Sequence, residues 1–212
     1  MAALFLICQK VLNSKILAFN IPAKSISYCQ SLQERFDFDF RLASPRKTRL
    51  GDFSYRPGTR PLITVNSDLN PYSFLITYIH EVAHCMVFRK YSFKVAPHGK
   101  EWKWAFQELA QPILTPEIFP VDVLIPLVRY LKNPKASTSG DPALLLALKK
   151  YDDPTEGAHK KPLIYLREGD LFVYNGRSFV KGPLRRTRVL CIETKSQKKY
   201  TIAAHALVEE QI

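Results

Sequence analysis

The sequence of 212 residues predicts an α+β protein with a small β-rich module at its C-terminal end. Three short segments with strand character precede a long apolar helix, an order typical of a small sheet packed on a helix. From residue 170 onward, short apolar runs alternate with turn residues, as in successive strands. A chain of this length is long enough for one main core and one appended module.

The predicted sheet comes from residues before position 70. Residues 25–35 are interpreted as a short helix with Ser25 as its cap. Residues 36–42 (FDFDFRL) alternate strictly between apolar and polar, as a half-buried strand does. Two further strands are expected, at about 50–55 and at 61–65. The first strand is expected to bury one face, which carries Phe36, Phe38, Phe40 and Leu42.

Residues 71–91 are predicted to form a core helix. Apolar residues occur around its whole circumference, which indicates burial on all sides. Asn70 stands at the N-cap position, and Pro71 fits the first helical position, where its missing N–H costs nothing. The start of this helix is therefore well specified by local sequence.

Two histidines of this helix, in the motif HEVAH, predict a metal site. His80 and His84 are four residues apart and lie on one helix face, so both imidazoles can reach one ion. Glu81 is rotated by about 100° from His80 and is better placed to reach a water on the metal. This is the geometry of the H-E-x-x-H zinc peptidases. The alternative is a pair of core histidines with a salt-bridged glutamate, whose burial would cost several kcal/mol without a partner.

A catalytic zinc ion usually has three protein ligands and one open position. His98 is the favoured third ligand, because Pro97 and Gly99 place it in a loop that leads into a second helix. Glu101 and Glu108 are the alternatives and would give a His2Glu set. The downstream face of that second helix is occupied by apolar residues, which favours His98. These residues are Trp102, Ala105, Phe106 and Leu109.

The motifs HEVAH and HGKEW, at this separation, resemble the SprT-like metalloprotease family, which includes bacterial SprT proteins and eukaryotic Spartan proteases. The resemblance extends to RKTRLGDF (46–53) and to residues 62–81, and it spans roughly residues 25–150. It implies Zn²⁺ on His80, His84 and His98, with Glu81 as general base and Trp102 packed behind the site. It also implies a zincin-like, minigluzincin-type core, in which a small antiparallel sheet lies on the motif helix.

The sequence departs from this family at its C-terminal end. Many members carry a zinc ribbon with two pairs of cysteines, whereas this chain contains no C-x-x-C. The tail is therefore either a ribbon without its metal or an unrelated small β barrel. The four cysteines are widely spaced, which suits free thiols in a reducing cytoplasm. They are Cys8, Cys29, Cys85 and Cys191.

The basic charge is concentrated in the same tail. The net charge is +12, and residues 160–212 contain eleven Lys or Arg against five Asp or Glu, which is half of that excess. Such a segment attracts polyanions, and interleaved aromatic residues can stack on exposed bases. We therefore expect DNA as a partner of this module, with a basic surface over core aromatics as the alternative.

Three segments follow from these observations: an N-terminal extension (1–24), a metalloprotease domain (25–152) and a basic β-rich module (160–212). Helical spacing of apolar residues favours a helix within 1–24 over an export signal, because no basic residues precede the apolar run. No segment has the roughly 18 apolar residues needed to span a membrane, so a cytoplasmic location is expected. Asp141 and Pro142 predict the start of a further helix, and 152–162 is the best linker.

The leading hypothesis is a zinc-dependent endopeptidase that acts on protein substrates, with DNA-associated proteins suggested by the resemblance. A second hypothesis, of a different class, is a nucleic-acid-binding or adaptor protein with a structural or vestigial metal site. A third is a metal-dependent amide hydrolase acting on small molecules. The sequence does not select an oligomeric state.

Overall fold

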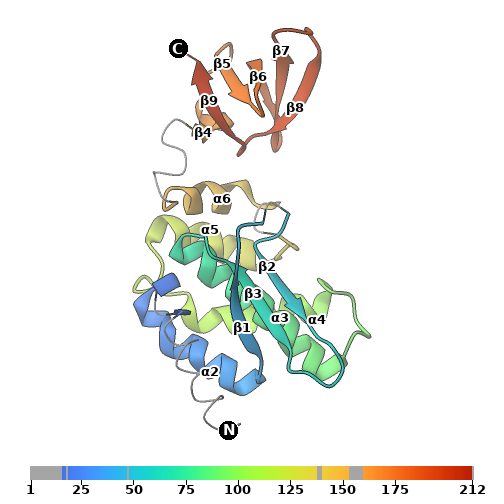
Figure 1. Ribbon diagram of the computed structural model, residues 1–212. Helices are drawn as coiled ribbons and strands as arrows, with labels where there is room; N and C mark the ends of the chain where they lie inside the picture. Colours follow the sequence, from blue (N-terminus) through green and yellow to red (C-terminus); the bar gives the residue numbers. More distant parts are fainter. Residues whose placement is uncertain (1–15, 18, 47, 138–139, 153–159, 212) are drawn as a thin grey trace. The chain divides into compact units, whose positions relative to one another are not determined.

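The computed structural model describes residues 16–17, 19–46, 48–137, 140–152 and 160–211 (Figure 1). The helix expected around residues 4–12 lies outside them. The chain divides into two compact units, Met1–Thr138 and Ser139–Ile212. Each unit has its own sheet, so the α+β prediction with a β-rich C-terminal part is confirmed.

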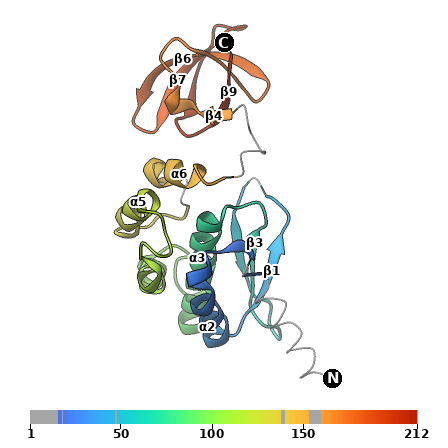
Figure 2. The ribbon, with the colours of Figure 1, turned by 90° about the vertical axis from the view of Figure 1, so that its left-hand side faces the viewer.

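The first unit contains the HEVAH and HGKEW motifs. Its helices are α2 (Ile26–Phe36), α3 (Pro71–Tyr91), α4 (Lys100–Ala110) and α5 (Val121–Leu131), with the short 3-10 turns η1 (Ala23–Ser25) and η2 (Gln111–Ile113). Its strands are β1 (Asp39–Ala43), β2 (Gly51–Ser54) and β3 (Leu62–Asn66). In Figure 2, α2 and α3 lie on the same side of the sheet.

The small sheet is mixed, which corrects the antiparallel sheet implied by the resemblance. Its strand order is β1-β3-β2, with β3 parallel to β1 and antiparallel to β2. The next strand along the chain, β2, lies at an edge of the sheet and does not pair with β1. The third strand, β3, lies between them. Alternation and turn residues indicate where strands lie along the chain, but they do not encode this spatial order.

The first strand begins later than the sequence predicts. Phe36 is the last residue of α2, and Asp37 follows with a positive φ of 45°. The Arg89 guanidinium donates hydrogen bonds to the carbonyl oxygens of both residues, so α3 stabilises the end of α2. Phe38 and Phe40 are buried as expected, whereas Leu42 is 38% exposed. The alternation therefore predicted a strand, but a tertiary contact determined where the preceding helix ends.

The buried face of the sheet packs on α3. The Phe40 ring lies 5.3 Å from Tyr78 and 6.2 Å from Phe74, measured between centroids. The Asn70 side chain accepts hydrogen bonds from the backbone N–H groups of Tyr72 and Ser73. The predicted limits, cap and burial of this helix are confirmed, and the helix is a rigid support for the residues that it carries.

The second unit opens with α6 (Pro142–Lys149), whose first turn is capped by Asp141 as predicted. A six-stranded antiparallel sheet of order β4-β9-β5-β6-β7-β8 follows and encloses its own apolar core, which includes Phe172 and Phe179. The tail is therefore β-rich, as predicted. Its strands are β4 (Lys160–Pro162), β5 (Leu171–Tyr174), β6 (Arg177–Arg185), β7 (Arg188–Glu193), β8 (Lys199–Ala203) and β9 (Leu207–Gln211).

Candidate metal centre

Three histidine side chains converge between α3 and the loop before α4. His80 and His84 project from one face of α3, and His98 lies in the turn that immediately precedes α4. The Nε2 atoms are 3.2 Å apart for His80 and His84, 3.1 Å for His84 and His98, and 3.3 Å for His80 and His98. Among the described residues, this is the group of three side chains that could hold a metal ion.

The triangle of nitrogen atoms fits a tetrahedral cation. Three corners of a tetrahedron with metal–nitrogen bonds of about 2.0–2.1 Å are about 3.3–3.4 Å apart. The observed separations of 3.1–3.3 Å are close to that requirement. Three imidazoles whose Nε2 atoms all face one point cannot satisfy one another by hydrogen bonds alone, since each neutral ring carries only one N–H. The donor set suits zinc among the common divalent ions.

The electrostatic environment keeps these histidines neutral. Burial, with repulsion from the other two histidines, holds the pKa of His80 well below its usual value. Burial and the neighbouring His98 lower the pKa of His84 to about 3, and burial also lowers the pKa of His98. Neutral imidazoles present the lone pair that a metal requires, so little proton competition is expected at neutral pH.

Trp102 supports all three imidazole rings from α4. Its ring centroid lies 4.6 Å from His80, 5.4 Å from His84 and 4.7 Å from His98. Its indole N–H donates a hydrogen bond of 3.4 Å to the backbone oxygen of His80. The side chain is fully buried and stacks on Phe106. This arrangement restricts the rotation of the three rings.

Glu81 follows His80 on α3, and its carboxylate lies against Gly51 of β2. It is 6% exposed, and its pKa is raised to about 8, mainly by burial and also by the nearby Asp52. Arg46, Arg49 and a hydrogen bond from the Phe53 backbone act in the opposite direction. A metal cation bound by the three histidines would lower the pKa of Glu81 and so favour its ionised form.

The structure separates His98 from the rival candidates. Glu101 and Glu108 are outside the convergent group, and the Glu108 side chain is exposed. Tyr78, two residues before His80, is fully buried and donates a hydrogen bond to the carbonyl oxygen of Cys29. The Tyr78 hydroxyl is therefore hydrogen-bonded in the core that α3 forms with α2.

Two contributors to this site have no signal in local sequence patterns. Gly51 and Phe53 belong to β2, and they meet Glu81 only because β2 passes over α3. The segment RKTRLGDF contains both residues, but the sequence predicts only a strand at about 50–55.

The fold and the site define a class: an α+β domain whose H-E-x-x-H helix and following turn present three histidines that could hold a metal ion. Residues 25–122 match the model of the SprT-like family. The resemblance stated from the motifs is thereby confirmed.

Individual relatives match over a shorter segment. Protein SprT of Yersinia pseudotuberculosis serotype O:1b (strain IP 31758) and Protein SprT of Yersinia pestis are each 50% identical to this chain over 30 residues. That match covers 14% of this chain and 17% of each relative. No solved structure gives a significant match to the chain. No described helix is long and apolar enough to cross a membrane.

Proposed function

We propose that the protein is a zinc-dependent endopeptidase with a zincin-like, minigluzincin-type core. The observation that carries this proposal is the convergence of three Nε2 atoms within 3.3 Å of one another, next to a buried glutamate on the same helix. Three protein ligands are typical of catalytic zinc, whereas a structural site has four. In the proposal, His80, His84 and His98 hold the zinc ion.

His80, His84 and His98 would hold a zinc ion that would supply Lewis-acid chemistry, the polarisation of a carbonyl group and the acidification of water. Glu81 accepts the proton of the attacking water and returns it to the leaving amine. Trp102 and the rigid helix keep the imidazoles oriented, so that little reorganisation accompanies the reaction. The burial of Glu81 excludes bulk water from its carboxylate.

The open edge of β2 supports a peptide as the substrate. Within the described residues, β2 pairs with β3 alone. The Leu50 carbonyl accepts a hydrogen bond of 2.8 Å from the Asn66 N–H, so alternate residues, starting at Gly51, direct their backbone groups away from β3. The Phe53 N–H on this edge faces the Glu81 carboxylate, so an extended peptide can add to the edge through its remaining backbone groups. A small amide offers no comparable ladder, which favours the endopeptidase over an amide hydrolase for small molecules.

Substitution of the proposed base and of one proposed ligand tests the chemistry. Glu81→Gln should retain one zinc per chain and lose casein cleavage by at least about a hundredfold, the scale of general base catalysis. His84→Ala should lose both the metal and the activity. Metal content is measured by atomic emission on the purified full chain. Undiminished cleavage by the Glu81→Gln protein would falsify the mechanism.

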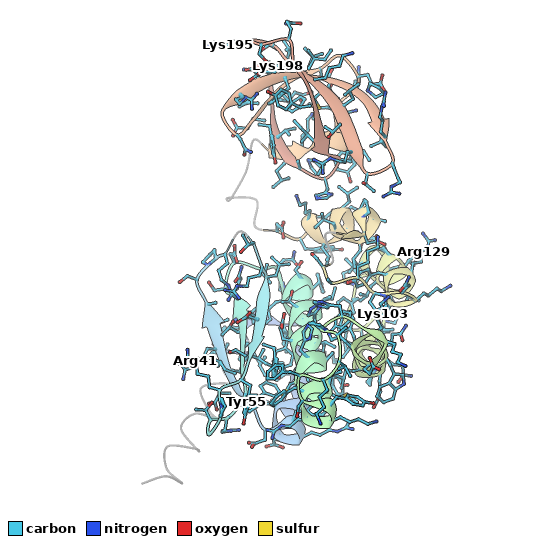
Figure 3. All side chains as sticks on the ribbon, turned by 90° about the vertical axis from the view of Figure 1, so that its right-hand side faces the viewer. Arg41, Tyr55, Lys103, Arg129, Lys195 and Lys198 are labelled. Carbon is cyan, nitrogen blue, oxygen red and sulfur yellow. The ribbon has the colours of Figure 1, made fainter. Side chains whose placement is uncertain are left out.

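DNA-associated proteins are the proposed substrates, with the basic second unit as a tether. Lys195 and Lys198 project from the turn between β7 and β8 (Figure 3). Arg185, Arg186 and Arg188 are exposed at the turn between β6 and β7. Both turns therefore present cations on flexible side chains, which suits contacts with phosphates.

A further inference from the structure

Gly51 of β2 passes very close to α3. A Cβ atom at Gly51 would lie 2.6 Å from Oε1 and 2.8 Å from Cγ of Glu81. It would also lie 2.7 Å from Cγ2 of Thr77. Such distances are far inside van der Waals contact, so any side chain at this position must displace one of its neighbours. The absence of a side chain at Gly51 therefore allows β2 to pass close to α3.

The neighbours of Gly51 have little room to move. Thr77 is held in one rotamer, because its hydroxyl donates a hydrogen bond of 2.8 Å to the Ser73 carbonyl. This bond directs the methyl group of Thr77 towards β2. Glu81 is 6% exposed, so protein atoms surround most of its side chain. A substitution at Gly51 would act on Glu81 or shift β2.

Strand β2 also contacts the Glu81 carboxylate directly. The Phe53 backbone N–H faces this carboxylate and lowers its pKa. Phe53 is two residues from Gly51, so the backbone groups of both residues point to the same edge. The strand thus acts on one carboxylate in two ways. Gly51 has no side chain where the Glu81 carboxylate lies, and the Phe53 amide faces that carboxylate.

We propose that Gly51 and the Phe53 N–H are positioning elements that hold the Glu81 carboxylate in its orientation beside the histidine group. This inference rests on the proposed function for its catalytic meaning. The contact between β2 and Glu81 does not depend on the proposed function. A carboxylate that acts as a base must stay aligned within a fraction of an ångström, since a displacement of about 1 Å costs on the order of a hundredfold in rate.

Hydrogen exchange of the Phe53 amide tests the contact without any activity measurement. This amide lies on the open edge of the sheet, so only the Glu81 carboxylate protects it. In ¹⁵N-labelled full-length protein, we expect slow exchange in the wild type and exchange at least about tenfold faster in Glu81→Ala and in Gly51→Ala, as for an amide released to solvent. Equal exchange in the three proteins would overturn the inference.

A second glycine in the same unit provides a matched control. Gly58 has a φ of 78°, and a Cβ there would meet no atom within 4 Å. Gly58→Ala therefore strains the backbone without touching Glu81. We expect Gly51→Ala to keep its zinc and lose kcat by about a hundredfold with KM changed less than about threefold. Gly58→Ala should lose stability but keep kcat. Equal kcat in both variants would contradict the positioning role.

The double variant Gly51→Ala/Thr77→Ser separates positioning from packing. Serine keeps the hydrogen bond to Ser73 and removes the methyl group that Gly51 faces. The new Cβ still meets the Glu81 carboxylate, so kcat should stay low whatever stability returns. Recovery of kcat would show a packing role only. If the wild type cleaves no protein while the exchange pattern holds, the proposed function fails and the contact stands.

Discussion

Trp102 shows how one side chain can stabilise both a core and a metal site. It is fully buried and touches all three imidazoles, whereas Trp104, two residues further along α4, is 54% exposed. Periodicity placed Trp102 on the apolar face, and the resemblance implied its position behind the histidines. Packing therefore contributes to metal affinity through the orientation of the ligands.

The two tryptophans allow a matched test of this role. We expect Trp102→Ala to lower the free energy of unfolding by about 3–5 kcal/mol, the usual cost of truncating a buried large aromatic residue, and to weaken zinc binding as well. Trp104→Ala should change the stability by less than about 0.5 kcal/mol, because its side chain is largely in solvent. Urea denaturation and zinc titration provide the measurements. Similar losses in both variants would contradict the assignment.

Glu193 gives the second unit a pH-dependent contribution to stability. Arg177 and Ser196 donate hydrogen bonds to its carboxylate, which lowers its pKa from 4.5 to about 2. A folded-state pKa below the unfolded value stabilises the fold above the unfolded pKa. This contribution is lost as the pH falls from about 4.5 towards 2.

The corresponding variant is Glu193→Gln. We expect it to be less stable than the wild type at pH 7, and the difference should shrink as the pH falls below about 4. Circular dichroism of thermal unfolding at several pH values follows this, with β-sheet signal as the reporter. A difference that is constant between pH 7 and pH 2 would show that ionisation of this carboxylate is not involved.

At the scale of elements, α3 combines a local start signal with tertiary burial. The Asn70 oxygen accepts two backbone hydrogen bonds, and Pro71 occupies the first position. The helix carries His80, Glu81 and His84, so its start helps to set the register of the site. Helix α6 has the same type of start, with Asp141 as its cap.

Removal of the cap of α3 should weaken the first unit without changing its chemistry. We expect Asn70→Ala to cost about 1 kcal/mol of stability and Asn70→Asp to cost little, because aspartate accepts the same hydrogen bonds. Zinc stoichiometry should stay at the wild-type value in both. Urea denaturation gives the stabilities, and a loss as large in Asn70→Asp as in Asn70→Ala would exclude capping as the cause.

At the scale of the whole molecule, the chain joins two units of different character. The candidate metal centre belongs to the first unit, and half of the net charge belongs to residues 160–212. Both tryptophans of the chain lie on α4. Tryptophan fluorescence therefore reports the unfolding of the first unit alone.

This separation yields a test of metal binding by the folded protein. Zinc that binds the native state stabilises it, by about 2.7 kcal/mol at a hundred times the dissociation constant. The fluorescence-detected unfolding midpoint should therefore rise with zinc and fall with a chelator. His84→Ala should show no such rise. An equal rise in that variant would place the zinc at another site.

The basic second unit carries the corresponding prediction for DNA. Binding to duplex DNA should weaken steeply as salt increases, because neutralised phosphates release counterions. It should be lost when residues 160–212 are removed, whereas zinc binding persists. Fluorescence anisotropy with a labelled duplex measures this across salt concentrations. Binding that is independent of salt, or retained by the shortened chain, would count against the tether.

Local sequence determined the features whose causes are themselves local. The limits of α3, its cap at Asn70 and the i, i+4 pair of His80 and His84 follow from helical periodicity and capping chemistry. The choice of His98 over Glu101 followed from a short loop between two helices. The sequence also shows the strong basic charge of the tail, because the net charge of a segment is the sum of the charges of its residues.

Tertiary structure alone decided the features that depend on distant segments. These include the position of β3 between β1 and β2, the end of α2 at Phe36 and the passage of Gly51 over Glu81. Each depends on which segments meet after the chain has collapsed. Side-chain periodicity records only whether a residue faces the core, because burial lowers the free energy without regard to the identity of the partner.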